Sequence, residues 1–142
     1  MNFGFIRKRL RNLSWPAPRR DQKLLLGRRG ERAAARYLKR QHFHVLVRNF
    51  RCVSGEVDLI CSQGDTIVFV EVKTRSSDDT EDPQEALRNA QRRRIENAAR
   101  YFLMRRSAQD RPCRFDVVTV VWPARGSPCI EHFPDAFQPR RS

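Results

Sequence analysis

The chain has 142 residues, the length of one ordinary domain, and can bury about two thirds of the surface that it exposes when unfolded. Its 29 Lys and Arg residues against 16 Asp and Glu give a formal net charge of +13, which favours a polyanionic partner, with nucleic acid as the obvious candidate. The four cysteines contain no CxxC pair, which argues against structural zinc, and no apolar membrane span or signal region is visible, so we expect a soluble cytoplasmic protein without a membrane partner.

Residues 1–22 are predicted to form a poorly ordered basic arm. Basic residues alternate there with aromatic ones, and the segment breaks at Pro16 and Pro18. Such an arm would add phosphate contacts, dock on a partner through its aromatic residues, or be a dispensable extension. Residues 23–137 are predicted to form a single domain, and residues 138–142 a short C-terminal tail.

A helix is predicted from Arg28 to Arg40, where several alanines favour helix formation. The helical period of about 3.6 residues places Glu31 on the apolar face, close to Ala34 and Leu38. A carboxylate on a packing face needs a partner or a metal ion, although an acid in the first turn also stabilises a helix through its dipole. Glu31 is therefore a candidate for a functional site, with the purely helical role as the alternative.

Residues 56–73 predict a hairpin of two apolar strands that nevertheless carry charged side chains. Because side chains alternate along a strand, Glu56 and Asp58 share one face of the first strand, while Glu71 and Lys73 share one face of the second. Acids are unusual in such strands, so this hairpin is the strongest candidate for a functional site.

A turn at Gln63 and Gly64 predicts that Glu56 faces Glu71 and that Asp58 lies diagonal to it. Two carboxylates about 4 Å apart repel by roughly 4 kcal/mol at an effective dielectric constant near 20. A divalent cation such as Mg²⁺ would resolve this repulsion, and the neighbouring lysine suggests a phosphate. The alternative is a solvated face on which the charges form cross-strand pairs.

A second helix is predicted to start near Pro83, with Asp82 as its N-cap. Gln91 falls on the apolar stripe of this helix between Leu87 and Ile95. An amide at this position would either reach a phosphate or a metal-bound water, or form a hydrogen bond with nearby backbone in the core.

The remaining predicted elements are strands. Phe115–Trp122 is predicted as a strand and Ile130–Phe133 as an edge strand that ends before Pro134. Asp116 would pair with an arginine at the strand end, or be a fourth acid of the site. With a further strand over Val45–Phe50, the predicted order is α-β-β-β-α-β-β. The fold class is therefore α/β, a single domain with a central mixed β-sheet flanked by helices.

An acid on a packing helix, an acid on one strand, Glu-x-Lys on the next strand and an amide on a second helix resemble the PD-(D/E)xK nuclease superfamily, which has the restriction-endonuclease-like fold. Four segments resemble the YraN family of predicted endonucleases: GRRGE at 27–31, GEVDLI at 55–60, FVEVKTR at 69–75 and RFD at 114–116. That family is similar in layout to Holliday-junction resolvases. The resemblance covers roughly Gly27 to Phe137. Family members often have Lys where this chain has Gln91, a residue that resolvase-like relatives tolerate.

The resemblance implies a metal-dependent nuclease that hydrolyses phosphodiester bonds in DNA, including branched or structured DNA. Asp58 and Glu71 would bind Mg²⁺ or Mn²⁺ together with the backbone carbonyl of Val72. Glu31 would act through a metal-bound water. Lys73 would position or deprotonate the attacking water, which requires that burial and the cation lower its pKa.

The resemblance also implies that Gln91 orients a phosphate or a water. Glu56 would be an accessory acid or would pair with a surface arginine. Arginines near these positions are candidate nucleic-acid contacts, namely Arg28, Arg29, Arg75, Arg88, Arg92 and Arg93. The alternative function is a nucleic-acid-binding module with this fold and little or no catalytic activity, and a ribonuclease is a third reading. We expect recognition of backbone geometry rather than of base sequence, and a reaction on two strands would favour a homodimer.

Overall fold

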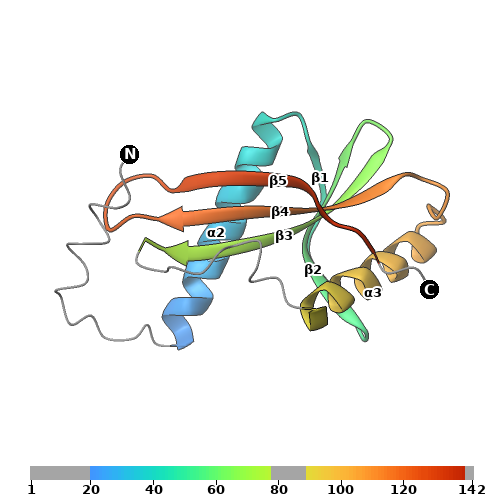
Figure 1. The fold of residues 1–142 in the computed structure, drawn as a ribbon, viewed down its shortest axis with the longest axis horizontal. Helices are drawn as coiled ribbons and strands as arrows, with labels where there is room; N and C mark the ends of the chain where they lie inside the picture. The colour runs from blue at the N-terminus through green and yellow to red at the C-terminus, as the bar shows by residue number, and fades with distance from the viewer. Residues whose placement is uncertain (1–19, 78–88, 140–142) are drawn as a thin grey trace.

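The computed structural model describes residues 20–77 and 89–139. Figure 1 shows one twisted sheet, with a long helix across it and a second helix near one end. Most of the predicted basic arm, the predicted helix start near Pro83 and the last residues of the predicted tail lie outside the described residues. The proposed division of the chain into arm, domain and tail therefore remains a prediction.

Helix α2 spans Arg20–Arg40, so it begins two turns before the predicted start at Arg28. The prediction was wrong here because Leu24, Leu25 and Leu26 are strong helix formers. Gly27 does not interrupt the helix, since a glycine in a helix interior costs only about 1 kcal/mol relative to alanine. The predicted end at Arg40 is confirmed.

Helix α3 spans Asn89–Arg105 in the described part of the chain, and the remaining elements are five strands. The strands are β1 (His44–Cys52), β2 (Gly55–Gln63), β3 (Thr66–Ser76), β4 (Cys113–Trp122) and β5 (Cys129–Phe137). They lie in the sheet in chain order, with β3 and β4 parallel and the other neighbours antiparallel. The predicted α/β class, the mixed sheet and the order α-β-β-β-α-β-β are confirmed.

Strand β5 is longer than predicted, because it continues through Pro134 to Phe137. A proline lacks a backbone donor, but at the edge of a sheet the missing hydrogen bond would have pointed to solvent. Asp135 follows with a φ of 53°, and its backbone N–H donates to Asp116 Oδ1 at 2.9 Å. This side-chain partner replaces a bond of the sheet ladder.

The register of the hairpin differs from the prediction. Gln63 pairs with Thr66, so the turn consists of Gly64 and Asp65. Gly64 has a φ of 57°, a left-handed conformation that glycine adopts without steric cost. Moving the turn by one residue shifts the pairing by two, which leaves every side chain on its predicted face.

The predicted partners of the acids were therefore wrong. Leu59 pairs with Val70, and the same register continued by one residue sets Asp58 opposite Glu71. In this register Glu56 does not face Glu71 of β3, as was predicted, and on its other side it pairs with Arg51 of β1. The shift brings together the two acids that the Asp and Glu-x-Lys motifs had singled out.

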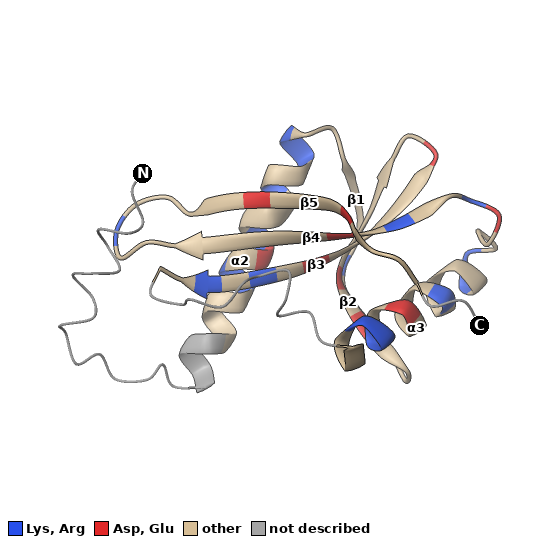
Figure 2. Cartoon of the chain, in the orientation of Figure 1, with Lys and Arg blue, Asp and Glu red and all other residues tan. Residues whose placement is uncertain are grey.

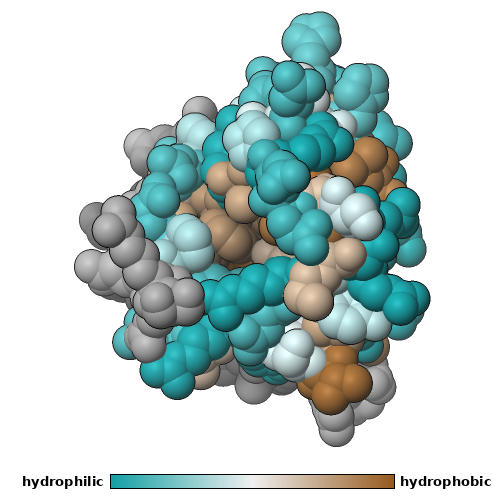
Figure 3. Space-filling view, turned by 90° about the vertical axis from the view of Figure 1, so that its right-hand side faces the viewer, coloured by the Kyte–Doolittle hydropathy of each residue, from teal (hydrophilic) through white to brown (hydrophobic). Residues whose placement is uncertain are grey.

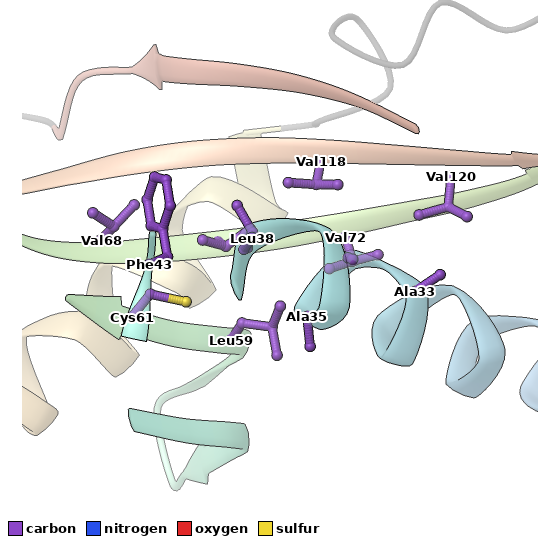
Figure 4. Close-up of a cluster of buried hydrophobic side chains, with 12 residues drawn as sticks. Ala33, Ala35, Leu38, Phe43, Leu59, Cys61, Val68, Val72, Val118 and Val120 are labelled. Carbon is purple, nitrogen blue, oxygen red and sulfur yellow. The ribbon is translucent and has the colours of Figure 1, made fainter. Parts of the chain in front are cut away.

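Each face of the sheet is covered by one helix. On one face, Leu38 of α2 packs among Val72, Val118 and Val120, as Figure 4 shows. The other face packs against α3 through a second cluster that includes Ile95 and Phe102 of the helix and Phe69, Phe115 and Phe137 of the sheet. Cys61 is fully buried in the first cluster.

Candidate nuclease-like site

The two central acids lie next to each other, Asp58 on β2 and Glu71 on β3. The backbone N–H of Val72 donates to Asp58 Oδ2 at 2.8 Å, and a hydrogen bond joins the two carboxyl groups. The Glu71 side chain is only 10% exposed. Burial and the neighbouring Asp58 raise the pKa of Glu71 to about 9, and burial also raises the pKa of Asp58. Burial and mutual repulsion therefore disfavour the state in which both carboxylates are charged, and a bound cation would stabilise that state.

Lys73 is connected to this pair through Gln91. The Gln91 Nε2 donates to Glu71 Oε1 at 2.8 Å, and Lys73 Nζ donates to Gln91 Oε1 at 2.8 Å. Lys73 Nζ also lies 3.7 Å from Glu71 Oε1. The alternative of a core amide bonded to nearby backbone is wrong, because the Gln91 amide bonds two site residues. Contact with a phosphate or a metal-bound water stays a prediction. The amide keeps the ammonium group beside the acids.

These side chains border one pocket of about 300 Å³ between the sheet and the first turns of α3. The pocket is lined by Glu56, Asp58, Glu71, Ala90, Gln91, Arg94 and Ile95. In Figure 2, acidic residues of β2 and β3 lie where the sheet approaches the basic residues of α3. The lining of the pocket therefore combines three acids with one arginine, Arg94.

Glu31 borders a neighbouring pocket of about 290 Å³, whose lining is largely basic. Arg28, Glu31, Arg32, Arg48, Asn49 and Leu59 line it. Burial and the charge of Asp58 raise the pKa of Glu31, although a hydrogen bond with the Asn49 side chain opposes this. Glu31 thus lies within electrostatic reach of the acid pair, and its side chain is half-buried on the predicted packing face.

Two glycines allow both helices to lie directly against the strands of the site. A side chain at Gly30 of α2 would collide with Thr74 of β3, and a side chain at Gly55 of β2 would collide with the backbone carbonyl of Arg94 in α3. Each glycine directly precedes an acid, Glu31 or Glu56. The close approach of the backbones therefore fixes where these two acids sit.

Glu56 is engaged with arginines rather than with the acid pair. Its carboxylate lies 3.6 Å from Arg51 Nε of β1 and 3.5 Å from Arg94 Nη2 of α3. Of the two roles that the sequence left open, pairing with a surface arginine matches the geometry.

The arginines predicted to contact nucleic acid lie in different environments. Arg28 lines the basic pocket, and Arg93 is exposed on α3. The guanidinium of Arg29 lies 4.3 Å from the ring centre of Trp122, and that of Arg92 lies 5.3 Å from the ring centre of Phe137, so both already contact aromatic rings. Arg75 follows Lys73 by two residues on β3, and Arg88 lies outside the described residues.

Three residues near the site were not predicted from the sequence. Asn49 has a φ of 51° and bonds Glu31; asparagine's tolerance of the left-handed conformation was the available signal. Arg51 and Arg94 flank Glu56. Arg51 could have been found only from the strand register, which the sequence leaves ambiguous.

Asp116 forms a separate buried cluster. It accepts hydrogen bonds from Arg114 Nε at 3.0 Å and from the Asp135 backbone, and His132 Nε2 lies 2.7 Å from its Oδ2. Burial alone would raise the pKa of Asp116, but these hydrogen bonds outweigh it and lower the pKa below its ordinary value. The predicted pairing with an arginine is confirmed, and Asp116 is not among the residues that line the pocket of Asp58 in the described part of the chain.

A family model described as "Uncharacterised protein family UPF0102" matches residues 30–120. The chain belongs to this family. A UPF0102 protein of Geotalea daltonii is 46% identical over 112 residues, which cover 79% of this chain and 88% of the relative. Another UPF0102 protein, from Geobacter metallireducens, is 43% identical over 113 residues, covering 80% of this chain and 92% of the relative. A third, from Nitratidesulfovibrio vulgaris, is 45% identical over 118 residues, covering 82% and 87%.

The UPF0102 match begins at Gly30, the point of contact between α2 and β3, and ends inside β4. It therefore includes Glu31, both members of the acid pair, Lys73 and Gln91. Among the described residues, no helix has both the length and the apolar character that crossing a membrane requires.

The acid pair supplies the kind of ligand that a hard divalent cation needs. Within residues 20–77 and 89–139, no group of three or more His, Cys, Asp and Glu side chains is arranged to hold a metal ion. Mg²⁺ is, however, usually bound through one or two carboxylates together with substrate phosphates. The pKa values of Asp58 and Glu71 are both raised by burial, so a cation bound between them would stabilise their charged forms. The donor set of this UPF0102 protein thus fits Mg²⁺ or Mn²⁺.

Proposed function

We propose that the protein is a metal-dependent nuclease that hydrolyses phosphodiester bonds in DNA. The observation that carries the proposal is the contact of buried Glu71 with half-buried Asp58, with Lys73 Nζ 3.7 Å from the Glu71 carboxylate, in a chain of net charge +13. Burying two acids together lowers the stability of the fold unless a cation offsets their charge. Such a pair is therefore a candidate for a functional site.

Asp58 and Glu71 would hold Mg²⁺ or Mn²⁺, with the Val72 carbonyl as a further oxygen ligand. The bound cation would lower the pKa of a coordinated water and offset negative charge on the phosphate. The attacking water would release a proton to solvent as its oxygen forms a bond to phosphorus, while the ester P–O bond breaks and the leaving oxygen takes up a proton from solvent. Val72 also donates its N–H to Asp58, which fixes that carboxylate in position.

Lys73 would orient the attacking water. Its side chain is 16% exposed, and the hydrogen bond to Gln91 directs the ammonium group toward Glu71. Gln91 therefore acts as a positioning residue, because its amide joins lysine and acid. Glu31 would help to hold water near Asp58 from the neighbouring pocket.

DNA is the proposed substrate because of the charge of the chain and the arginines around both pockets. The net charge is +13, and Arg28, Arg32 and Arg48 line the pocket that contains Glu31. Arginine binds phosphate through a planar fork of donors. Branched or distorted DNA is the substrate class that the resolvase resemblance implies.

A cleavage panel tests this proposal. The full chain is incubated with linear, nicked, flapped and four-way DNA and with RNA, in Mg²⁺, in Mn²⁺ and in EDTA. We expect cleavage of DNA that requires the metal and that Asp58→Asn, Glu71→Gln or Lys73→Ala reduces by at least about 100-fold, the scale of a lost catalytic group. Exposed matched controls, Glu131→Gln and Lys39→Ala, should retain activity.

Binding without cleavage of any substrate in either metal would contradict the nuclease proposal. The protein would then be a nucleic-acid-binding module that carries this pocket. If the protein cleaves RNA and none of the DNA substrates, RNA rather than DNA is its substrate. Activity that persists in EDTA would overturn the role given to the cation.

A further inference from the structure

Glu56 connects two arginines from different elements at the edge of the acid pocket. Arg51 comes from β1 and is paired with Glu56 across the strands, while Arg94 comes from α3 and lines the pocket itself. The two carboxylate oxygens are divided between them, with Oε2 at 3.6 Å from Arg51 and Oε1 at 3.5 Å from Arg94. One anion therefore lies between two cations beside the acid pair.

These ion pairs are weak. The side chains of Arg51, Glu56 and Arg94 are 76%, 47% and 59% exposed, and both separations are longer than a hydrogen bond. Exposed ion pairs of this kind contribute at most about 1 kcal/mol each. Another anion with oxygen acceptors could therefore displace Glu56 at little cost.

The backbone nevertheless holds the two arginines in place. Gly55 lies against the carbonyl of Arg94, so α3 cannot move away from the start of β2 without losing this contact. Arg51 is fixed by the ladder between β1 and β2. The fold thus presents two guanidinium groups on either side of one small anion, and the anion present is a side chain of the protein itself.

We propose that Arg51 and Arg94 bind one phosphate of the substrate strand, adjacent to the phosphate that is cleaved, and that Glu56 occupies this phosphate site in the free protein as an internal competitor. This inference rests on the proposed nucleic-acid substrate. A carboxylate and a phosphodiester both offer two oxygen acceptors to guanidinium groups. Arg94 borders the same pocket as Asp58 and Glu71, which places the phosphate next to the reacting one.

The inference predicts that an acid close to the site opposes substrate binding. Fluorescence anisotropy of the full chain with a labelled 20-base-pair DNA duplex in EDTA measures this without any cleavage. We expect Glu56→Gln to tighten binding at least about threefold, the scale of a released surface ion pair. Arg51→Ala and Arg94→Ala should each weaken binding by a similar factor.

Matched controls separate this effect from overall charge. Asp65→Asn removes the same charge in the hairpin turn at the other end of β2, about 30 Å away at the rise of a strand. It should change affinity less than Glu56→Gln. Arg125→Ala, an exposed arginine between β4 and β5, is the control for the two arginines. The triple variant Glu56→Gln/Arg51→Ala/Arg94→Ala should bind DNA no more tightly than the double variant Arg51→Ala/Arg94→Ala.

The outcomes distinguish the two proposals. If the wild-type chain binds neither duplex nor four-way DNA at low salt, the proposed substrate fails. If the wild type binds but Glu56→Gln binds no more tightly than Asp65→Asn, the competitor role of Glu56 is overturned while the proposed function stands. If Glu56→Gln still tightens DNA binding in the triple variant, Arg51 and Arg94 do not form the phosphate site. Unchanged melting temperatures verify that each variant is folded.

Discussion

Glu71 is held where its charged form is unfavourable. Burial and Asp58 raise the pKa of Glu71 to about 9 from an ordinary value of 4.5. A raised pKa means that the folded state binds the proton more tightly, so the contribution of Glu71 to stability is fully present below pH 4.5 and is lost as the pH rises toward 9. Gln has the same shape and cannot ionise. We expect Glu71→Gln in EDTA at pH 8 to increase the free energy of unfolding by more than about 1 kcal/mol, since each pKa unit corresponds to that amount.

Thermal unfolding of both proteins between pH 5 and pH 9 measures this effect. The difference in Tm between Glu71→Gln and wild type should grow with pH, whereas the exposed control Glu131→Gln should show a constant difference. A Tm difference for Glu71→Gln that is independent of pH would show that Glu71 ionises normally. The same substitution should remove cleavage activity. Glu71 would then be required for activity although it lowers the free energy of unfolding.

Asp116 has the opposite character, because its charged form is stabilised. Asp116→Ala would leave Arg114 and His132 without their acceptor and would remove the partner of the Asp135 backbone N–H. We expect a loss of about 3 kcal/mol in urea unfolding at pH 7, the scale for breaking a buried ion pair. The lowered pKa means that this contribution is present above the unfolded pKa of Asp and is lost as the pH falls through the folded value. A variant as stable as wild type would contradict this role, and exposed Asp110→Ala is the control.

At the scale of helices and strands, the surroundings of three glycines predict that substitution by alanine has opposite effects on stability at different positions. Gly27 of α2 has open space where a side chain would lie, whereas Gly30 and Gly55 abut Thr74 and the Arg94 carbonyl. Gly27→Ala should therefore stabilise the protein by about 0.5 to 1 kcal/mol through helix propensity. Gly30→Ala and Gly55→Ala should each destabilise it by about 1 to 3 kcal/mol through overpacking. Chemical denaturation of the three variants tests this, and equal effects would mean that the helices do not lie so close to the sheet.

The elements that the sequence predicted best are those with strong periodicity. Alternation in β2 and β3 correctly assigned the faces of Asp58, Glu71 and Lys73, and the helical period placed Gln91 on the packing stripe of α3. The predicted register was wrong, because a turn at Gln63 and Gly64 and a turn at Gly64 and Asp65 both satisfy the local rules. Only tertiary packing chooses between them.

The helix boundaries and the partners of Glu56 show the same limit. Local propensity does not decide whether Gly27 ends a helix, since packing of α2 on the sheet outweighs a cost of about 1 kcal/mol. Arg51 and Arg94 are separated from Glu56 by strand pairing and by a helix. Contacts between distant elements such as these leave no local pattern in the sequence.

At the scale of the whole molecule, charge is distributed so that acids gather inside a basic protein. Buried Glu71 and half-buried Asp58 lie on β3 and β2, and the helices carry many of the basic residues (Figure 2). The face on the right-hand side of Figure 1 is mostly hydrophilic, with small apolar patches between polar residues (Figure 3). Such a surface suits contact with a charged backbone better than burial against an apolar partner.

This distribution predicts that DNA binding depends steeply on salt. Each phosphate neutralised on a duplex contributes a slope of about −0.9 to log affinity against log salt concentration. Contacts from the pocket of Arg28 and Arg48 and from Arg94 would neutralise at least about three phosphates, so doubling the salt should weaken binding roughly sixfold or more. Anisotropy titrations between 50 and 400 mM NaCl measure the slope. Arg28→Ala should reduce its magnitude by about 0.9 while Arg125→Ala leaves it unchanged, and affinity that is independent of salt would exclude the nucleic-acid backbone as the partner of this surface.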